Sequence, residues 1–454
     1  MLKTRQKKGK MNKFVSSLAV FAATTAVVSC SESDALADVQ EPVGGSQTIR
    51  FAVSVDHGDI TRAQRITTAD FTEYQVWATN GDTKKPWLSA STIEGVFNND
   101  VWKETSNTAT WDNLSDKVNP NTFFALSANG GKTSLANAGL TLTELADNDN
   151  AESNQEVAED KYLDYAMPTS GSQVDITKQV DLMAAYTPGI AKNAPVALNF
   201  KHILSNIEIK VLLTDAMWNP TAKRFDNVDD TQWAFDEASW FYISYIIIHG
   251  LKANGQYTFS NGTWTTSGDA VDIKIPIDKF FYFHDLRQIA NEYKDAHGLT
   301  DEELVNYHTE IEHSVYDDAL VDANSIMVIP QQVTPWDYLA APTSSDCCVE
   351  VYGVSCSAND ESIVDQAAHE AAIRDHMNAD GTWKVDEDGW GTYWNADEFG
   401  SLYFGNEYPA TDEEGPGLSG YYQLSTKFEP GKKYTIWLNL GRIRYEDGTP
   451  MASV

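Results

Sequence analysis

The first clear pattern in the folded part of the chain is an alternation of apolar and polar residues over positions 47–56. Its apolar positions, which share one side of an extended chain, are Ile49, Phe51, Val53 and Val55. A period of two is typical of a strand with one buried face, so this segment predicts the first strand of a sheet. The polar residues 56–65 that follow predict an exposed loop that a protease can reach.

Short strand-like segments recur along the rest of the chain, separated by clusters of Gly, Asn, Asp and Pro. They cover residues 74–78, 122–127, 196–213, 241–249, 271–277, 325–329, 348–354 and 433–440. Many short strands with turn residues between them favour β-sandwich domains, so we expect an all-β fold. Residues 254–264 carry two turn signals around an alternating piece and predict a hairpin.

Two stretches break the β pattern and predict helices. Thr300 can cap a helix over residues 301–310, and Glu303 would complete a capping box with it. Residues 361–377 form the other predicted helix. Because both stretches come late in the chain, we expect small helical insertions on a β scaffold.

An uninterrupted small and apolar run over residues 14–28 follows Lys13 near the start of the chain. The run is shorter than the roughly 20 apolar residues that a membrane-spanning helix needs, and a small residue and Cys30 follow it directly. This arrangement resembles the lipobox of bacterial lipoproteins, in which the cysteine thiol is lipidated. We therefore expect a lipoprotein signal peptide at 1–29, lipidation at Cys30 and a flexible tether at 30–45.

The acidic composition limits the partners of the chain. The formal charge is −33, and removing the leader, with its six basic and no acidic residues, lowers the charge by six to about −39. Such a chain repels nucleic acid and anionic lipid headgroups, so we expect no nucleic-acid partner.

The cysteine content does not suggest a disulfide scaffold. Besides Cys30 the chain has Cys347, Cys348 and Cys356, an odd number for an exported protein. We expect these thiols to be buried and inert, although a turn at Gly353 would allow one local disulfide.

Four segments of the chain, in this order behind a lipobox, resemble those of a known family. The segments are Thr61-Arg62-Ala63, 196–211, 326–331 and 430–440. The strand pair at 196–211 looks like the one that marks the fimbrillin-like family, whose members are type V pilus subunits and anchored fimbrial lipoproteins of anaerobic Gram-negative bacteria. The resemblance runs from Cys30 to about Leu440 and is less clear over 280–316 and 359–418.

The resemblance implies two tandem transthyretin-like β-sandwich domains. With a boundary near residues 188–194, the N-terminal domain would cover 46–190 and the C-terminal domain, with insertions, 191–454. The resemblance also implies cleavage by an arginine-specific surface protease between Arg62 and Ala63, with Arg65 as a second candidate.

Removal of the first strand would have a physical consequence. It would expose an apolar groove and unpaired backbone groups, which a strand of a neighbouring subunit can fill by strand addition. The alternative is that this strand is a permanent part of its sandwich. The resemblance implies that stalk subunits carry a further C-terminal strand, which they donate to the next subunit. Residues 448–454 of this chain offer little sequence for such a strand. This departure favours a tip or accessory subunit, or a truncated sequence.

Motifs for catalysis, cofactors and metals are incomplete. His369 opens a motif like that of a zinc-protease helix, but Ile373 stands where the second histidine should be. His369 and His376 would share a helical face, either as two metal ligands or as part of a solvated surface. Residues 386–391 resemble a calcium loop that lacks two of its ligands. His202, in an apolar strand, indicates a hydrogen-bonded core histidine. We expect no catalytic residue, no cofactor and no metal.

A segment rich in Gly, Asp and Asn carries a cluster of aromatic residues. Its members include Trp383, Trp390, Tyr393 and Trp394. Aromatic rings that stack on sugar faces beside amides that bind hydroxyl groups would make a glycan platform. The same rings would also suit the small hydrophobic core of an insertion, and the sequence leaves both interpretations open.

Together these observations predict a structural, adhesive pilus subunit, a tip or accessory one, and not an enzyme. The expected location is the surface of the outer membrane and the fimbrium. The expected partners are other pilus subunits, the outer membrane through the N-terminal lipid, the arginine-specific protease, and a host or bacterial receptor or glycan. The alternative is a static surface glycan-binding lipoprotein that does not polymerise.

Overall fold

The structure is a computed structural model. It describes residues 48–55, 70–80, 86–99, 101–111, 120–135, 138, 140, 162–171, 173–214, 216–227, 238–318, 326–336, 343–357, 378–379, 419–440 and 452–453. The chain forms two compact units, residues 1–45 and 46–454, and all described residues belong to the second. The expected signal peptide, Cys30 and the tether therefore lie outside the described residues.

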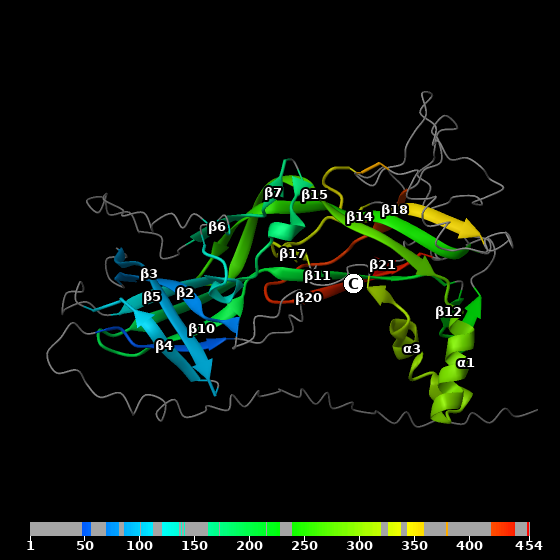
Figure 1. Cartoon of the computed structure of the whole chain (residues 1–454), viewed down its shortest axis with the longest axis horizontal. Coiled ribbons are helices and arrows are strands. Elements are labelled where there is room, and N and C mark those ends of the chain that lie inside the picture. The colour runs from blue at the N-terminus through cyan, green and yellow to red at the C-terminus, as the bar shows by residue number, and fades with distance from the viewer. Residues whose placement is uncertain are drawn as a thin grey trace, which may run out of the picture. The chain divides into compact units, whose positions relative to one another are not determined.

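Strands dominate the described part of the chain (Figure 1). Up to His202 they are β1 (Phe51–Val55), β2 (Glu73–Asn80), β3 (Pro86–Asn98), β4 (Val101–Asn107), β5 (Asn121–Ala128), β6 (Tyr162–Ala166), β7 (Thr169–Ser170), β8 (Gln173–Val174), β9 (Leu182–Ile190) and β10 (Val196–His202). The later strands are β11 (Ser205–Leu212), β12 (Ala216–Asn219), β13 (Arg224–Asn227), β14 (Ala238–Thr258), β15 (Thr263–Tyr282), β16 (Asp317–Asp318), β17 (Ile326–Val328), β18 (Cys348–Ser357), β19 (Ser419–Gln423), β20 (Lys433–Asn439) and β21 (Ala452–Ser453). The described helices are α1 (Leu286–His297), α2 (Asp301–Leu304), α3 (His308–Ser314) and 3₁₀ turns at Asn129–Gly131 and Ile176–Lys178. Each strand-like segment expected from the sequence coincides with one or two of these strands, so the all-β expectation with small helical insertions is confirmed.

The first sheet has seven strands in the order β1-β10-β9-β5-β2-β3-β4. One core cluster draws buried side chains from all seven strands, among them Phe51, Tyr74, Phe123 and Trp102. The two edges of the sheet also meet, because Thr48 just before β1 pairs with Thr110 just after β4. The sheet is therefore curled around its own apolar face, so that its two edge strands, β1 and β4, lie beside each other. We call the line between these two strands the seam.

The opposite face of this sheet is also covered. Trp77 of β2, Phe124 of β5 and Leu182 of β9 belong to a second, larger core cluster that includes side chains of the later strands. β2 and β5 are thus buried on both faces, which explains why their apolar residues run on nearly without interruption.

Two five-stranded sheets share the second core. One contains β16, β11, β20 and β21, with β17 also paired to β11, and the other contains β15, β14, β18 and β19, with β6 paired to β14. Ile209 of β11 and Leu438 of β20 lie in the same buried cluster as Ile246 of β14 and Val351 of β18. The apolar faces of both sheets therefore meet in one core, as in a sandwich.

The predicted hairpin at 254–264 is present, but the position of its turn was only partly predicted. β14 and β15 are joined at residues 259–262, where Gly262 has a positive φ of 68°. The other turn signal, Asn254-Gly255, lies inside β14 and pairs with β15. A Cβ at Gly255 would lie 3.1 Å from both Ile329 and Trp264, so this glycine provides room for packing and does not make a turn.

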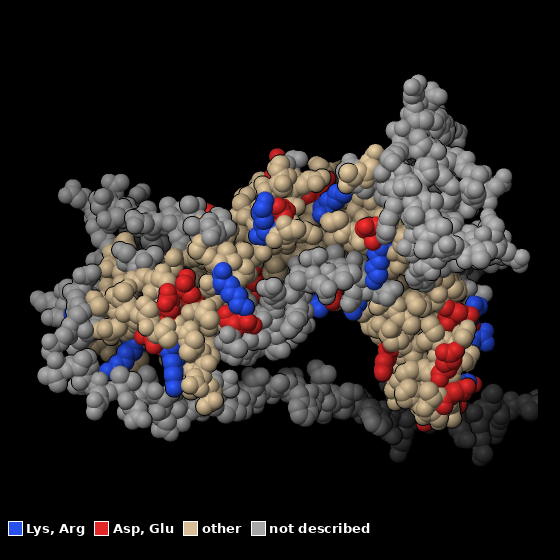
Figure 2. Space-filling model, in the orientation of Figure 1, with Lys and Arg blue, Asp and Glu red and all other residues tan. Residues whose placement is uncertain are grey.

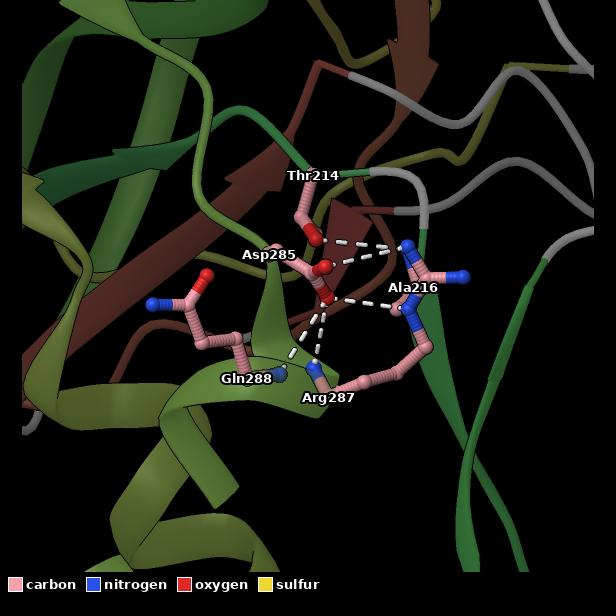
Figure 3. Close-up of polar contacts among 5 residues, drawn as sticks. All are labelled: Thr214, Ala216, Asp285, Arg287 and Gln288. Atoms are coloured by element: carbon pink, nitrogen blue, oxygen red, sulfur yellow. Dashed lines mark hydrogen bonds and ion pairs between the residues drawn. The ribbon is translucent and has the colours of Figure 1, made fainter. Parts of the chain in front are cut away.

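The helical segment differs from its prediction in two ways. The capping box of Thr300 and Glu303 is present, but α2 ends at Leu304 and a separate helix, α3, starts at His308. The sequence analysis also missed α1, whose N-terminus is capped by Asp285. As Figure 3 shows, Oδ1 of Asp285 accepts hydrogen bonds from the backbone N–H of Arg287 at 3.0 Å and of Gln288 at 3.3 Å. The hydrogen-bonded Arg287 guanidinium holds the pKa of the Asp285 carboxyl below its ordinary value.

Acidic side chains gather on this helical segment, as Figure 2 shows for one face. The exposed ones are Glu292, Asp295, Asp301, Glu302, Glu303 and Glu310. Part of the strong negative charge of the chain is therefore solvated on a helical surface. The other predicted helix, at 361–377, lies outside the described residues.

The expected domain boundary at residues 190 and 191 stays a prediction. The strand Val196–His202, which was expected to open the second domain, pairs with β1 and β9 of the first sheet. The next strand, β11, belongs to a different sheet. The change of sheet therefore occurs after His202, because the chain leaves the ladder at Ile203 and Leu204.

Candidate functional site

β1 lies at one edge of the first sheet, and its position there tests the expectation for the first strand. β1 runs parallel to β10, with Phe51 opposite Val196 and Val55 opposite Phe200. It is an edge strand, so β10 is its one ladder neighbour in the described sheet. β1 is also the one parallel strand of this sheet, and every other neighbouring pair is antiparallel.

The alternation predicted for this strand is confirmed. Phe51, Val53 and Val55 are 7 to 8% exposed and Ile49 is fully buried, whereas Ala52 and Ser54 are exposed. Burial of each such apolar side chain contributes about 1.5–3 kcal/mol. We refer to the groove that holds these four side chains as the β1 seat.

Aromatic rings form the floor of the β1 seat. The Phe51 ring lies nearly perpendicular to the rings of Tyr74 in β2 and Phe123 in β5, each at a centroid distance of 6.1 Å. Tyr74 also contacts Phe200 of the neighbouring strand β10 at 5.2 Å. Edge-to-face pairs of this kind contribute about 0.5–1.5 kcal/mol each beyond area burial. The seat therefore favours an aromatic residue at the position of Phe51.

Side chains of β4 bind the open edge of β1. The backbone N–H of Phe51 donates to Oε1 of Glu104 at 3.2 Å, and Nδ2 of Asn107 donates to the carbonyl oxygen of Ile49 at 2.8 Å. The backbone N–H of Ile49 donates to the carbonyl oxygen of Ala109 at 2.9 Å. β1 and β4 thus close the seam of the sheet largely through side chains.

Three polar groups of the core cluster that contains Phe51 have no hydrogen-bond partner in the described structure. They are the hydroxyl of Tyr74 and the indole N–H groups of Trp87 and Trp102. Burial, together with the nearby Glu104 carboxylate, raises the pKa of the Tyr74 hydroxyl. An unpaired buried donor costs about 1–3 kcal/mol, so the packing around β1 is not optimal for stability.

The other described residues that the sequence analysis singled out are structural. His202 is buried, and its Nδ1 lies 2.9 Å from Oδ1 of Asp181, so the expectation of a hydrogen-bonded core histidine is confirmed. Cys347 and Cys348 are buried free thiols, and burial raises the pKa of Cys347 to about 12. β18 runs unbroken through Gly353 to Ser357, so the turn that a disulfide from Cys348 would need is not formed.

The remaining sequence-predicted site residues lie outside the described part of the chain. They are the cleavage candidates Arg62, Ala63 and Arg65, the lipidation site Cys30, the glycan platform Trp383, Trp390, Tyr393 and Trp394, and the histidines His369 and His376.

The sequence analysis missed a cluster of charged side chains on the second sandwich. Nδ1 of His249 in β14 lies 2.8 Å from Asp272 of β15, and its Nε2 lies 2.8 Å from Glu350 of β18. Burial of the imidazole opposes protonation, but the hydrogen bonds that the ring donates to the Glu350 and Asp272 carboxylates, together with their negative charges, outweigh it and raise the pKa of His249. The imidazole therefore links three adjacent strands, β14, β15 and β18.

Two other kinds of site are absent from the described ranges. No three His, Cys, Asp or Glu side chains there are arranged to hold a metal ion. No helix in the same part of the chain has the length and apolar character needed to cross a bilayer.

Comparisons with known proteins give structural likenesses only. No family model and no curated protein sequence matches the chain. Among solved structures, it is similar to a fimbrial protein from Bacteroides vulgatus ATCC 8482, with 12% identity, a TM-score of 0.40 and coverage of 88% of this chain and 96% of that chain. It is also similar to a fimbrilin from Porphyromonas gingivalis W83, with 11% identity, a TM-score of 0.32 and coverage of 88% and 100%. The names of these proteins match the family that the sequence motifs resemble.

Proposed function

We propose that this chain is a structural subunit of a surface fimbrium and that β1 is a replaceable strand. In this proposal the chain is exported as a lipoprotein modified at Cys30 and is cut after Arg62. A strand of another subunit then occupies the β1 seat. The observation that carries the proposal is the position of β1, which is at a sheet edge, has one ladder neighbour and has its apolar side chains buried in the core of the sheet.

The chain order supports replacement of this strand. Residues 56–69 connect β1 to the segment before β2 and contain Arg62 and Arg65. A cut there would leave β1 attached to the rest of the fold by non-covalent contacts alone. The cost of an empty seat would be about 1.5–3 kcal/mol for each of the four apolar side chains, which favours rapid filling by another strand.

The finer parts of the proposal concern position and architecture. We propose an adhesive role at the tip or as an accessory subunit, with a host or bacterial receptor or glycan as the ligand. We also propose that the two cores correspond to two tandem sandwich domains, with the change of sheet after His202 as the candidate boundary.

Mass spectrometry of the protein in isolated fibres tests the proposal. We expect the chain in the fibre to begin at Ala63, and we expect a variant with Arg62→Ala and Arg65→Ala to reach the surface without polymerising. A matched control is Arg224→Ala, which removes an exposed arginine from the β12–β13 hairpin. Fibres whose subunits still contain residues 47–62, or normal fibres from the double variant, would contradict the proposal.

A further inference from the structure

We infer that Glu104 and Asn107 of β4 form a backbone clamp that holds the outer edge of whichever strand occupies the β1 seat. The ligand of this clamp is an extended peptide segment of a partner subunit with apolar side chains at four alternate positions, the second of them aromatic. The inference rests on the proposed function, because it concerns the strand that replaces β1.

The direction of the backbone groups in β1 explains why a clamp is needed. The carbonyl oxygen of Arg50 accepts from the N–H of Val196 in β10, so the groups of even-numbered residues face the ladder. The N–H and C=O groups of Ile49, Phe51 and Val53 then face away from β10, because direction alternates along a strand. Ladder pairing satisfies one side of β1, and on the other side β4 binds the N–H of Phe51 and the carbonyl oxygen of Ile49.

The clamp offers one acceptor and one donor in fixed positions. Glu104 accepts from the Phe51 N–H and Asn107 donates to the Ile49 carbonyl oxygen. Asn107 is itself held in place, since its Nδ2 also donates to Glu104 Oε2 at 2.7 Å and its Oδ1 accepts from the Ala109 N–H at 2.9 Å. The two side chains are therefore positioned together before a strand binds.

The side chains of the strand, and not its backbone, distinguish between registers. A shift of one residue would turn the polar side chains of the strand into the seat. A shift of two residues would restore the alternation, but it would move the aromatic side chain away from Tyr74 and Phe123. Every residue offers the clamp the same backbone groups, so the clamp holds the strand in place and the aromatic floor selects the side chain that lies there.

The resident strand shows the chemistry of the ligand. β1 is the peptide seen in the seat, and its sequence places an aromatic residue between aliphatic ones on the buried side. The exposed residues, such as Ala52 and Ser54, place no such requirement on the sequence of a partner strand. A partner strand therefore needs the apolar pattern and free N–H and C=O groups at its first two apolar positions, and its exposed residues can vary.

A peptide-exchange experiment with a modified backbone tests the clamp. The mature full-length protein, cut at a protease site inserted within residues 56–69, is incubated with a fluorescent peptide of residues 46–62, and the affinity is measured by polarisation. N-methylation of the peptide at Phe51 removes the donor to Glu104 and leaves the β10 ladder intact. N-methylation at Val53, whose N–H also faces away from β10, controls for the effect of the methyl group on the peptide.

We expect the Phe51 methylation to weaken binding about three- to tenfold more than the Val53 methylation, the range of one hydrogen bond at a partly exposed site. In the Glu104→Ala protein the difference between the two peptides should disappear. Lys103→Ala, which changes an exposed neighbour on the same strand, should leave it unchanged. Equal affinities of the two methylated peptides for the wild-type protein would overturn the clamp and leave strand exchange standing. Failure of the unmodified peptide to exchange would instead contradict the proposed function.

Discussion

Replacement of Phe51 by alanine should destabilise the first sheet more than any other single change in β1. The ring is 7% exposed and touches Tyr74 and Phe123 edge-on. Alanine at this position removes the ring from the centre of the β1 seat. It keeps the backbone, the pairing with β10 and the contact of the Phe51 N–H with Glu104.

The magnitude follows from the burial of the ring and its neighbours. Phe→Ala changes in well-packed cores cost about 3–5 kcal/mol, as the sum of lost transfer free energy and the cavity that remains. β1 is an edge strand with one ladder neighbour, so the surroundings can relax into part of the cavity. We therefore expect a loss of about 3 kcal/mol for the free energy of unfolding of this sheet.

Native-state hydrogen exchange of the mature protein is the appropriate assay, because two cores need not unfold in one transition. Amides of β1, β10 and β9 should lose protection in Phe51→Ala, and those of β14 and β15 should keep it. Ala52→Ser is the matched control, since Ala52 is exposed on the same strand and its change should stay within about 0.5 kcal/mol. If Phe51→Ala exchanged like the wild type in β10, the seat would not depend on its apolar contacts.

Three further predictions concern other parts of the structure. The pKa of His249 is raised in the folded protein, so its ion pairs stabilise the fold fully below the unfolded-state pKa of about 6.5. This stabilisation is lost as the pH rises through the folded-state pKa. The urea midpoint of the wild type should therefore fall across that pH range, and that of His249→Gln should not. Cys347 should resist alkylation in the native protein at pH 8 and react after denaturation, because it is buried and its pKa is raised to about 12. Gly353→Ala should destabilise the β14–β18 pair by several kcal/mol, because a Cβ at this position would collide with the carbonyl oxygen of Tyr242. The loss should be measurable as a lower thermal stability. Gly171→Ala should cost less, because no atom lies near a Cβ at that position.

The features predicted from the sequence are those that local residue patterns determine. The alternation around Phe51 identified a strand with one buried face because side-chain direction in a strand has a period of two. The capping box of Thr300 was found because both partners lie within one turn. α1 had similar signals, with Asp285 at its N-cap, Gln288 three residues later and Gly298 after its end. Those signals were present in the sequence and were overlooked among the surrounding strand patterns.

Features that depend on distant residues could not be predicted. Phe51 and Glu104 are 53 residues apart, and His249 and Glu350 are 101 residues apart. Their pairing depends on which strands become neighbours, and the apolar pattern of a strand does not specify its partner. The parallel pairing of β1 with β10 is of the same kind, since the alternation of Val196–His202 suits either the first or the second core.

The contacts that hold β1 differ from those of a central strand, and the proposed replacement depends on this difference. A central strand is fixed by two ladders, whereas β1 has one ladder, four buried side chains and a seam closed by Glu104 and Asn107. The side-chain contacts can open without disturbing β4, because the β3–β4 ladder does not include them. The unpaired hydroxyl of Tyr74 beneath Phe51 shows that the resident strand does not satisfy every group in its seat. If β1 is exchanged as proposed, a strand that places a hydrogen-bond acceptor near that hydroxyl should bind more tightly than β1.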